Sequence, residues 1–244
     1  MKFSIVLATL AAVASAAPSR DISTSSGNKV QKRAVFTPKT FDALSISGGN
    51  AGTAKEDALT KLSGLPADLT TVDKADLAFL DGVNKIANQA ERGAYNVKIA
   101  ATAPGEDALA LQRAKIQNKV LKLTATVMGL QAQQAQGKNV TAKLEEETKK
   151  LNKNIADDVA NAGKPATALQ FNASTDNPAA SEVAKDDALA TKAGDVIDQS
   201  LAAVGGGQGA AAKGKKNGGN GKGKGAGAAS KAVEAAQDAV GDEE

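Results

Sequence analysis

Apolar residues in the middle of the chain recur at alternating steps of three and four, the spacing of an amphipathic helix. The clearest stripe consists of Leu80, Val83, Ala87, Ala90, Ala94, Val97 and Ala101. Thr70 or Thr71 is the expected N-cap of this helix, and Pro104-Gly105 ends it. Asp73 and Asp76 suit its first turn, because carboxylates favour the positive end of the helix dipole.

One helix is predicted before this one in the chain and another after it. The first runs from about Ala51 to Leu62 and ends before Gly64-Leu65-Pro66. The other opens with Glu106 and Asp107 and fades toward Gly137. Its apolar stripe consists of Leu109, Ile116, Val120, Leu123, Val127 and Leu130. The same pattern places three lysines on the opposite, solvent-facing side: Lys115, Lys119 and Lys122.

A further helix is predicted after Asn139, with Thr141 as its cap and Gly163-Lys164-Pro165 as its end. Its stripe consists of Leu144, Leu151, Ile155 and Val159. Glu145–Lys149 and Glu146–Lys150 are i,i+4 pairs in the favourable order. A weaker helical pattern extends from Ser181 to Leu201.

Short connections near Pro104 and Gly137 imply that successive helices fold back on each other. The sequence therefore predicts an all-α fold, an Ala-rich antiparallel bundle of about four helices within residues 34–171. A weakly helical linker, residues 172–204, follows the bundle, and a Gly/Lys-rich tail completes the chain. The alternative is that the stripes form a coiled coil with a partner protein.

The first sixteen residues have the pattern of a secretory signal peptide. Lys2 precedes an apolar stretch from Phe3 to Val13, and Ala14-Ser15-Ala16 matches the A-x-A cleavage pattern, with cleavage expected after Ala16. The stretch is too short to span a bilayer, so no membrane anchor is predicted. A buried N-terminal core segment is the alternative interpretation.

Residues 17–33 resemble a short propeptide, because they are polar and end in the dibasic pair Lys32-Arg33. A chance pair of charges in a linker is the alternative. The full chain has a formal net charge of +3. Residues 1–33 hold five basic residues and one acidic residue, so the part from Ala34 onward has a net charge of −1. The mature protein is thus predicted to be nearly neutral.

The tail, residues 205–244, lacks the apolar residues that would offset the entropy of ordering, so we expect it to be disordered. It contains lysines that are candidates for weak binding to polyanions: Lys213, Lys215, Lys216, Lys222 and Lys224. No aromatic residue or arginine lies among them, which disfavours base stacking. A solvated flexible tail is the simpler interpretation.

The chain contains no cysteine and no histidine. Disulfides, a cysteine nucleophile, the usual Ser-His-Asp triad and His/Cys metal sites are therefore excluded. No catalytic residue, metal site or cofactor is predicted. A hydrolase that uses paired carboxylates remains an unfavoured alternative, because the acidic residues are expected on helix faces where solvent and lysine partners account for them. The six aromatic residues, five Phe and one Tyr, also offer little for stacking on sugar rings.

Two N-glycosylation sequons occur, at Asn139-Val140-Thr141 and Asn172-Ala173-Ser174. Both are expected in loops or at helix edges, where a glycan can be attached, so Asn139 and Asn172 are the candidate acceptors.

The segment from about Ala34 to Phe171 resembles a fungal family of small secreted proteins of unknown function. The resemblance is carried by three stretches: residues 41–54 (FDALSISGGNAGTA), 115–125 (KIQNKVLKLTA) and 150–156 (KLNKNIA). It implies an extracellular helical protein and supplies no catalytic residues. Together with the signal peptide, it suggests a secreted, non-enzymatic protein that binds a partner at a host interface, as an effector-like protein, or at the cell wall.

Overall fold

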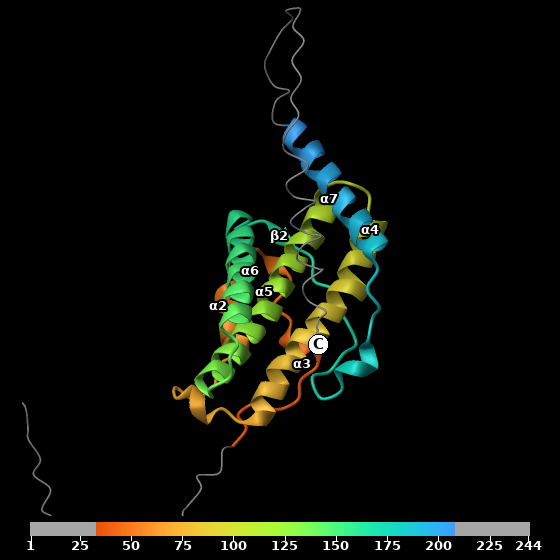
Figure 1. Ribbon diagram of the computed structural model, residues 1–244. Coiled ribbons are helices and arrows are strands. Elements are labelled where there is room, and N and C mark those ends of the chain that lie inside the picture. Colours follow the sequence, from red (N-terminus) through yellow and green to blue (C-terminus); the bar gives the residue numbers. More distant parts are fainter. Residues whose placement is uncertain (1–32, 208–244) are drawn as a thin grey trace, which may run out of the picture. The chain divides into compact units, whose positions relative to one another are not determined.

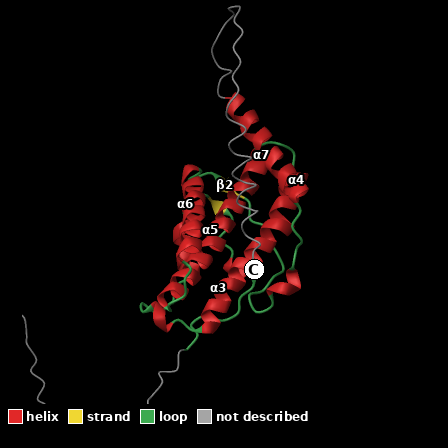
Figure 2. Ribbon diagram, in the orientation of Figure 1, coloured by secondary structure: helices red, strands yellow, loops and turns green. Residues whose placement is uncertain are grey.

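The computed structural model describes residues 33–207, and helices account for most of this range (Figures 1 and 2). The helices of six or more residues are α2 (Ala54–Lys61), α3 (Lys74–Ala90), η2 (Glu91–Asn96), α5 (Glu106–Ala135), α6 (Thr141–Ala160) and α7 (Asp187–Gly207). The short ones are α1 (Phe41–Leu44), η1 (Leu69–Thr71), α4 (Val97–Ala101) and η3 (Pro178–Ser181). The predicted all-α bundle is confirmed.

Helix α5 is the centre of the fold. It contacts α2, α3, α6 and α7, and in Figure 1 it runs between α6 on one side and α3 on the other. Its predicted apolar stripe is buried throughout, from Leu109 to Leu130. Because neighbours surround α5, several of its polar residues are buried as well, including Arg113, Gln117 and Asn118. Over most of its length this helix therefore has no solvent-exposed side, in contrast to the prediction.

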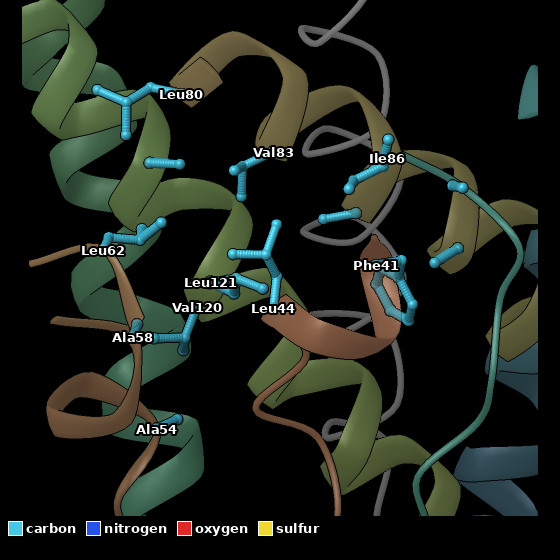
Figure 3. Close-up of a cluster of buried hydrophobic side chains, with 14 of the residues drawn as sticks. Phe41, Leu44, Ala54, Ala58, Leu62, Leu80, Val83, Ile86, Val120 and Leu121 are labelled. Carbon is cyan, nitrogen blue, oxygen red and sulfur yellow. The ribbon is translucent and has the colours of Figure 1, made fainter. Parts of the chain in front are cut away.

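The main hydrophobic core lies between α5, α3 and the short N-terminal helices (Figure 3). Phe41 and Leu44 of α1 are fully buried and point into this cluster. Ala54 and Ala58 of α2 are also fully buried, and small side chains of this kind allow helix backbones to approach closely. Each alanine removes little apolar surface from water at about 25 cal/mol per Å², so the seam depends on many small contacts.

A two-residue antiparallel ladder joins β1 (Gly49–Asn50) to β2 (Pro165–Ala166), where the sequence predicts only turns. Just beyond β1, Gly52 adopts a φ of 116°, a left-handed conformation that disfavours side chains. Its N–H donates to Asp158 Oδ2 on α6 at 3.0 Å, and the N–H of Ala54 donates to the same oxygen at 2.9 Å. Asp158 therefore fastens the start of α2 to α6.

The long predicted helix over residues 70–101 begins later and is interrupted. Asp73, rather than Thr70 or Thr71, is the N-cap, and its side chain accepts a hydrogen bond from the N–H of Ala75 at 2.8 Å. Between α3 and α4, η2 is a π-helix. A π-helical turn contains more residues than an α-helical one, so it shifts the buried face along the sequence. Val97 is consequently 45% exposed, whereas Tyr95 and Ile99 are fully buried.

Helix α6 also departs from its predicted stripe. Val159 is 57% exposed, and the buried residues of α6 are Asn154 and Asp158. The reason is that this helix contacts the rest of the protein through polar groups as well as through Leu151 and Ile155, which are only partly buried. The predicted pair Glu146–Lys150 is present, with a separation of 3.0 Å between Oε1 and Nζ.

The weak helical pattern near the C-terminus of the described chain forms α7, which contacts α4 and α5. Ala193 and Val196 pack there against Ile99 and Leu111, in a second, smaller cluster of buried side chains. Within residues 33–207, no helix is both long enough and apolar enough to cross a bilayer.

Candidate functional site

Glu91 occupies the first position of η2 and is only 2% exposed. Three ammonium groups of α5 converge on its carboxylate. The Nζ atoms of Lys119 and Lys122 lie 3.0 and 3.1 Å from its oxygens, and that of Lys115 lies 3.9 Å away. We call these four residues the lysine cluster. The prediction that the three lysines face solvent is wrong, since Lys115 and Lys119 are 2% and 7% exposed.

The electrostatics of the cluster favour a carboxylate that is charged near neutral pH. Burial by itself would raise the pKa of Glu91, because it penalises the charged form. The positive charges of Lys119, Lys122 and Lys115 outweigh burial and hold the pKa of Glu91 far below its usual range. A carboxyl group with so low a pKa is a poor general acid or base near neutral pH. It can, however, fix the position of the ammonium groups around it.

The π-helical turn also leaves a buried polar atom without a partner. Asn96, at the end of η2, is 5% exposed, and its Oδ1 atom accepts no hydrogen bond. Asn96 lines a cavity of about 480 Å³ together with Asn88, Glu91 and Arg92. We call it the η2 cavity. The segment from Val183 to Ala190 forms its other wall. π-Helical turns are frequent at functional sites, and unsatisfied buried groups call for an explanation.

A larger groove of about 780 Å³ runs along α3, α5 and α6 and ends at η3. We call it the lysine groove. Its basic lining residues are Lys85, Arg92, Lys119, Lys122, Lys143 and Lys150. Its acidic lining residues are Asp81, Glu147 and Glu182. Asn88, Arg92 and Val183 line both this groove and the η2 cavity. Glu91 lines the η2 cavity, and Lys119 and Lys122 line the groove, so the lysine cluster lies beside both.

The α6 wall of the groove carries a lysine that is paired with two carboxylates. Burial would lower the pKa of Lys150, but hydrogen bonds to Glu146 and Glu147 raise it above the usual value. The Nζ atom lies 3.0 and 3.1 Å from these carboxylates, and the side chain is 15% exposed. Lys143, in the first turn of the same helix, is exposed at the groove. The groove therefore presents both fixed and exposed ammonium groups.

The expectation that solvent and lysine partners account for the acidic residues is wrong at Asp76 and Asp158, which are almost fully buried; Glu91 is equally buried but has lysine partners. Their partners differ, because lysines surround Glu91 whereas backbone N–H groups bind Asp76 and Asp158. Among residues 33–207, no group of three or more acidic side chains is arranged to hold a metal ion.

The other predicted site residues are spread over the chain. Asn139, Asn172 and Arg33 are all exposed, and glycosylation of the two asparagines stays a prediction. Ala16, Lys32 and the tail lysines from Lys213 to Lys224 lie outside the described residues. The lysine cluster was not predicted as a site. The sequence signal that could have pointed to it is the i,i+4 spacing of Glu91, Tyr95 and Ile99, because all three of these residues are buried.

The comparisons with known proteins identify a family without an assigned activity. A family model described as "Domain of unknown function (DUF8454)" matches residues 36–170, which include the helices that carry the lysine cluster. No curated protein and no solved structure matches the chain.

Proposed function

The chain belongs to the family defined by this domain of unknown function, and we propose that it is a secreted, non-enzymatic protein that binds an anionic ligand in the lysine groove. It would act at a host interface, as an effector-like protein, or at the cell wall. The observation that carries the proposal is the charge of the groove, where basic side chains outnumber acidic ones over a volume of about 780 Å³. Grooves of this size suit an oligomeric or drug-sized ligand.

The ligand class we favour is an acidic oligosaccharide. Lysine binds carboxylate and sulfate groups as a compact point charge, without a fixed geometry. Among the described residues, no aromatic side chain lines the groove, so neither nucleobases nor neutral sugar rings find a stacking surface there. An acidic glycan is recognised mainly by charge, which is what the groove offers. It is also a ligand that a secreted protein meets outside the cell.

The chemistry of the lysine cluster supports binding rather than catalysis. A glycosidase needs one carboxylic acid of raised pKa as proton donor. Glu91 has the opposite property, because the surrounding lysines hold its pKa low. Its role in the proposal is to fix Lys119 and Lys122 in the lining of the groove, with their Nζ atoms 3.0 and 3.1 Å from its carboxylate.

Binding of an oligogalacturonate to the full chain tests the proposal, with Lys143→Gln as the main variant. Lys143 is exposed, so its loss should leave the fold intact. Removing one exposed charge from the groove should weaken binding about two- to fivefold at low salt, and added salt should reduce the difference. The matched control is Lys149→Gln, because Lys149 is exposed on the same helix but does not line the groove.

The outcome distinguishes the groove from general charge. Equal losses from the two variants would contradict binding in the groove, as would binding that does not change with salt. A DNA oligonucleotide that binds more tightly than the oligogalacturonate, with the same dependence on Lys143, would replace the acidic glycan as the ligand class.

The extracellular part of the proposal has its own test. A tagged copy of the full chain is expressed in a fungal host, and the culture is fractionated into medium, wall and cytosol. We expect the protein in the medium or the wall, because residues 1–16 have the pattern of a signal peptide. Retention in the cytosol would overturn secretion without affecting the measured binding in the groove.

A further inference from the structure

The chain immediately after the dibasic pair is held by one buried carboxylate. Asp76, in the first turn of α3, is 1% exposed. Its Oδ1 atom accepts hydrogen bonds from the N–H of Val35 at 2.8 Å and of Phe36 at 2.9 Å. The Phe36 ring also stacks on Phe79, one turn further along α3, with ring centroids 4.5 Å apart. Residues 35 and 36 are therefore fixed to α3.

The second oxygen of this carboxylate is the unusual one. Asp76 Oδ2 is buried and has no hydrogen-bond partner. A buried carboxylate oxygen without a partner is unfavourable, because the group has lost its water and gained nothing in return. The site is thus suited to one more hydrogen-bond donor, preferably a positively charged one.

We propose that Asp76 is the binding site for the α-ammonium group that cleavage after Arg33 creates on Ala34. Arg33 and Ala34 are both exposed, so a protease can reach the bond between them. The nitrogen of Ala34 is separated from that of Val35 only by the Cα and carbonyl carbon of Ala34, roughly 3–4 Å by covalent geometry. The Val35 nitrogen already lies 2.8 Å from Asp76 Oδ1.

The covalent step is a hydrolysis by a protease specific for dibasic pairs. Water adds across the peptide bond, the carboxylate stays on Arg33, and the nitrogen of Ala34 becomes an amine that takes up a proton near neutral pH. Before the cut, this nitrogen is a neutral amide that is tied to Arg33. After the cut, it carries a positive charge and rotates freely about the Ala34 backbone, which lets it reach Asp76 Oδ2. Cleavage would then stabilise the fold, and would not only remove the preceding residues.

This inference goes beyond the proposed function and does not depend on the lysine groove. The test starts from the intact full chain and cuts it in vitro, with mass spectrometry to confirm a single cut after Arg33. We expect the cut to raise the Tm by about 2–4 °C in the natural sequence. In Asp76→Asn the gain should disappear, because the amide keeps an oxygen for Val35 and Phe36 but has no charge.

The matched control is Asp73→Asn, which removes one negative charge close to Asp76. Asp73 caps α3 through the N–H of Ala75, a role that asparagine also fills, and it makes no contact with residues 35 and 36 in the hydrogen bonds described. This variant should keep the full gain on cleavage. The proposal is overturned if the cut raises the Tm of Asp76→Asn as much as that of the natural sequence.

A second measurement keeps the proposal testable if Asp76→Asn fails to fold. The pKa of the Ala34 α-amino group, followed by NMR in the cut natural chain and in cut Asp73→Asn, should lie above the usual range of about 7.7–8.0 in both. A pKa within that range would show that the new terminus is in water and not bound to Asp76.

Discussion

Glu91 and Asp158 are equally buried, at 2% exposure each, yet the two regions around them are built differently. At the contact of α2 with α6, Asp158 accepts hydrogen bonds from two backbone N–H groups, so its role is to hold a turn. At the contact of η2 with α5, Glu91 meets lysine side chains, two of which also line the groove. Burial alone therefore does not identify a candidate site, whereas the partners of a buried charge do.

Removing the charge of Glu91 tests this comparison most strongly. Glu91→Gln keeps the shape of the side chain but leaves Lys115, Lys119 and Lys122 without their shared carboxylate. Breaking a buried ion pair on one side typically costs about 3–5 kcal/mol, so we expect a loss of that size in the free energy of unfolding. Urea denaturation measures it.

A second substitution shows whether the loss comes from the lysines. In the double variant Glu91→Gln/Lys119→Gln, fewer charges are left without a partner, so its loss should be smaller than the sum of the two single losses. Additive losses, or a cost below about 1 kcal/mol for Glu91→Gln, would contradict the central role of the cluster.

The contact of α2 with α6 should lose less stability when its buried charge is removed. Asp158→Asn keeps an acceptor for the N–H groups of Gly52 and Ala54 but turns charge-assisted hydrogen bonds into neutral ones. We expect a loss of about 1–2 kcal/mol by urea denaturation. Binding of the anionic ligand should not change, because Asp158 does not line the groove. A large loss of binding in this variant would mean that the two regions are coupled.

The helices themselves follow from local sequence patterns. Stripes at steps of three and four predict α3, α5 and α6, because an amphipathic face needs only local spacing. The lysine cluster does not follow from such patterns, for two physical reasons. The π-helical turn moves Tyr95 and Ile99 inward in place of Val97. The surroundings of α5 are set by tertiary contacts, which turn an apparently solvent-facing row of lysines into a buried one.

The dependence of stability on acid pH provides a further test of the buried charge of Glu91. The folded-state pKa of Glu91 is lowered from its ordinary value of 4.5, so its contribution is fully present above pH 4.5 and is lost as the pH falls toward the folded-state pKa. The natural chain should therefore lose up to about 1.4 kcal/mol per pH unit below that value from this one group. In Glu91→Gln this part of the slope should be absent. Urea denaturation between roughly pH 5 and pH 3 measures this slope of the free energy of unfolding against pH. If the natural chain and Glu91→Gln have equal slopes, Glu91 is not held in its charged form.

Removing one charge of an exposed ion pair on α6 should give the smallest loss in the free energy of unfolding among these substitutions. Lys153 Nζ lies 2.7 Å from Asp157 Oδ2, a shorter separation than any in the lysine cluster, but the side chains are 47% and 41% exposed. Water and salt screen such a pair, so Lys153→Gln should cost only about 0.3–0.5 kcal/mol at low salt and less at high salt. If this variant cost as much as Glu91→Gln in urea denaturation, the distance between charges and not their burial would determine the energy. The comparison between buried and exposed charge would then have to be abandoned.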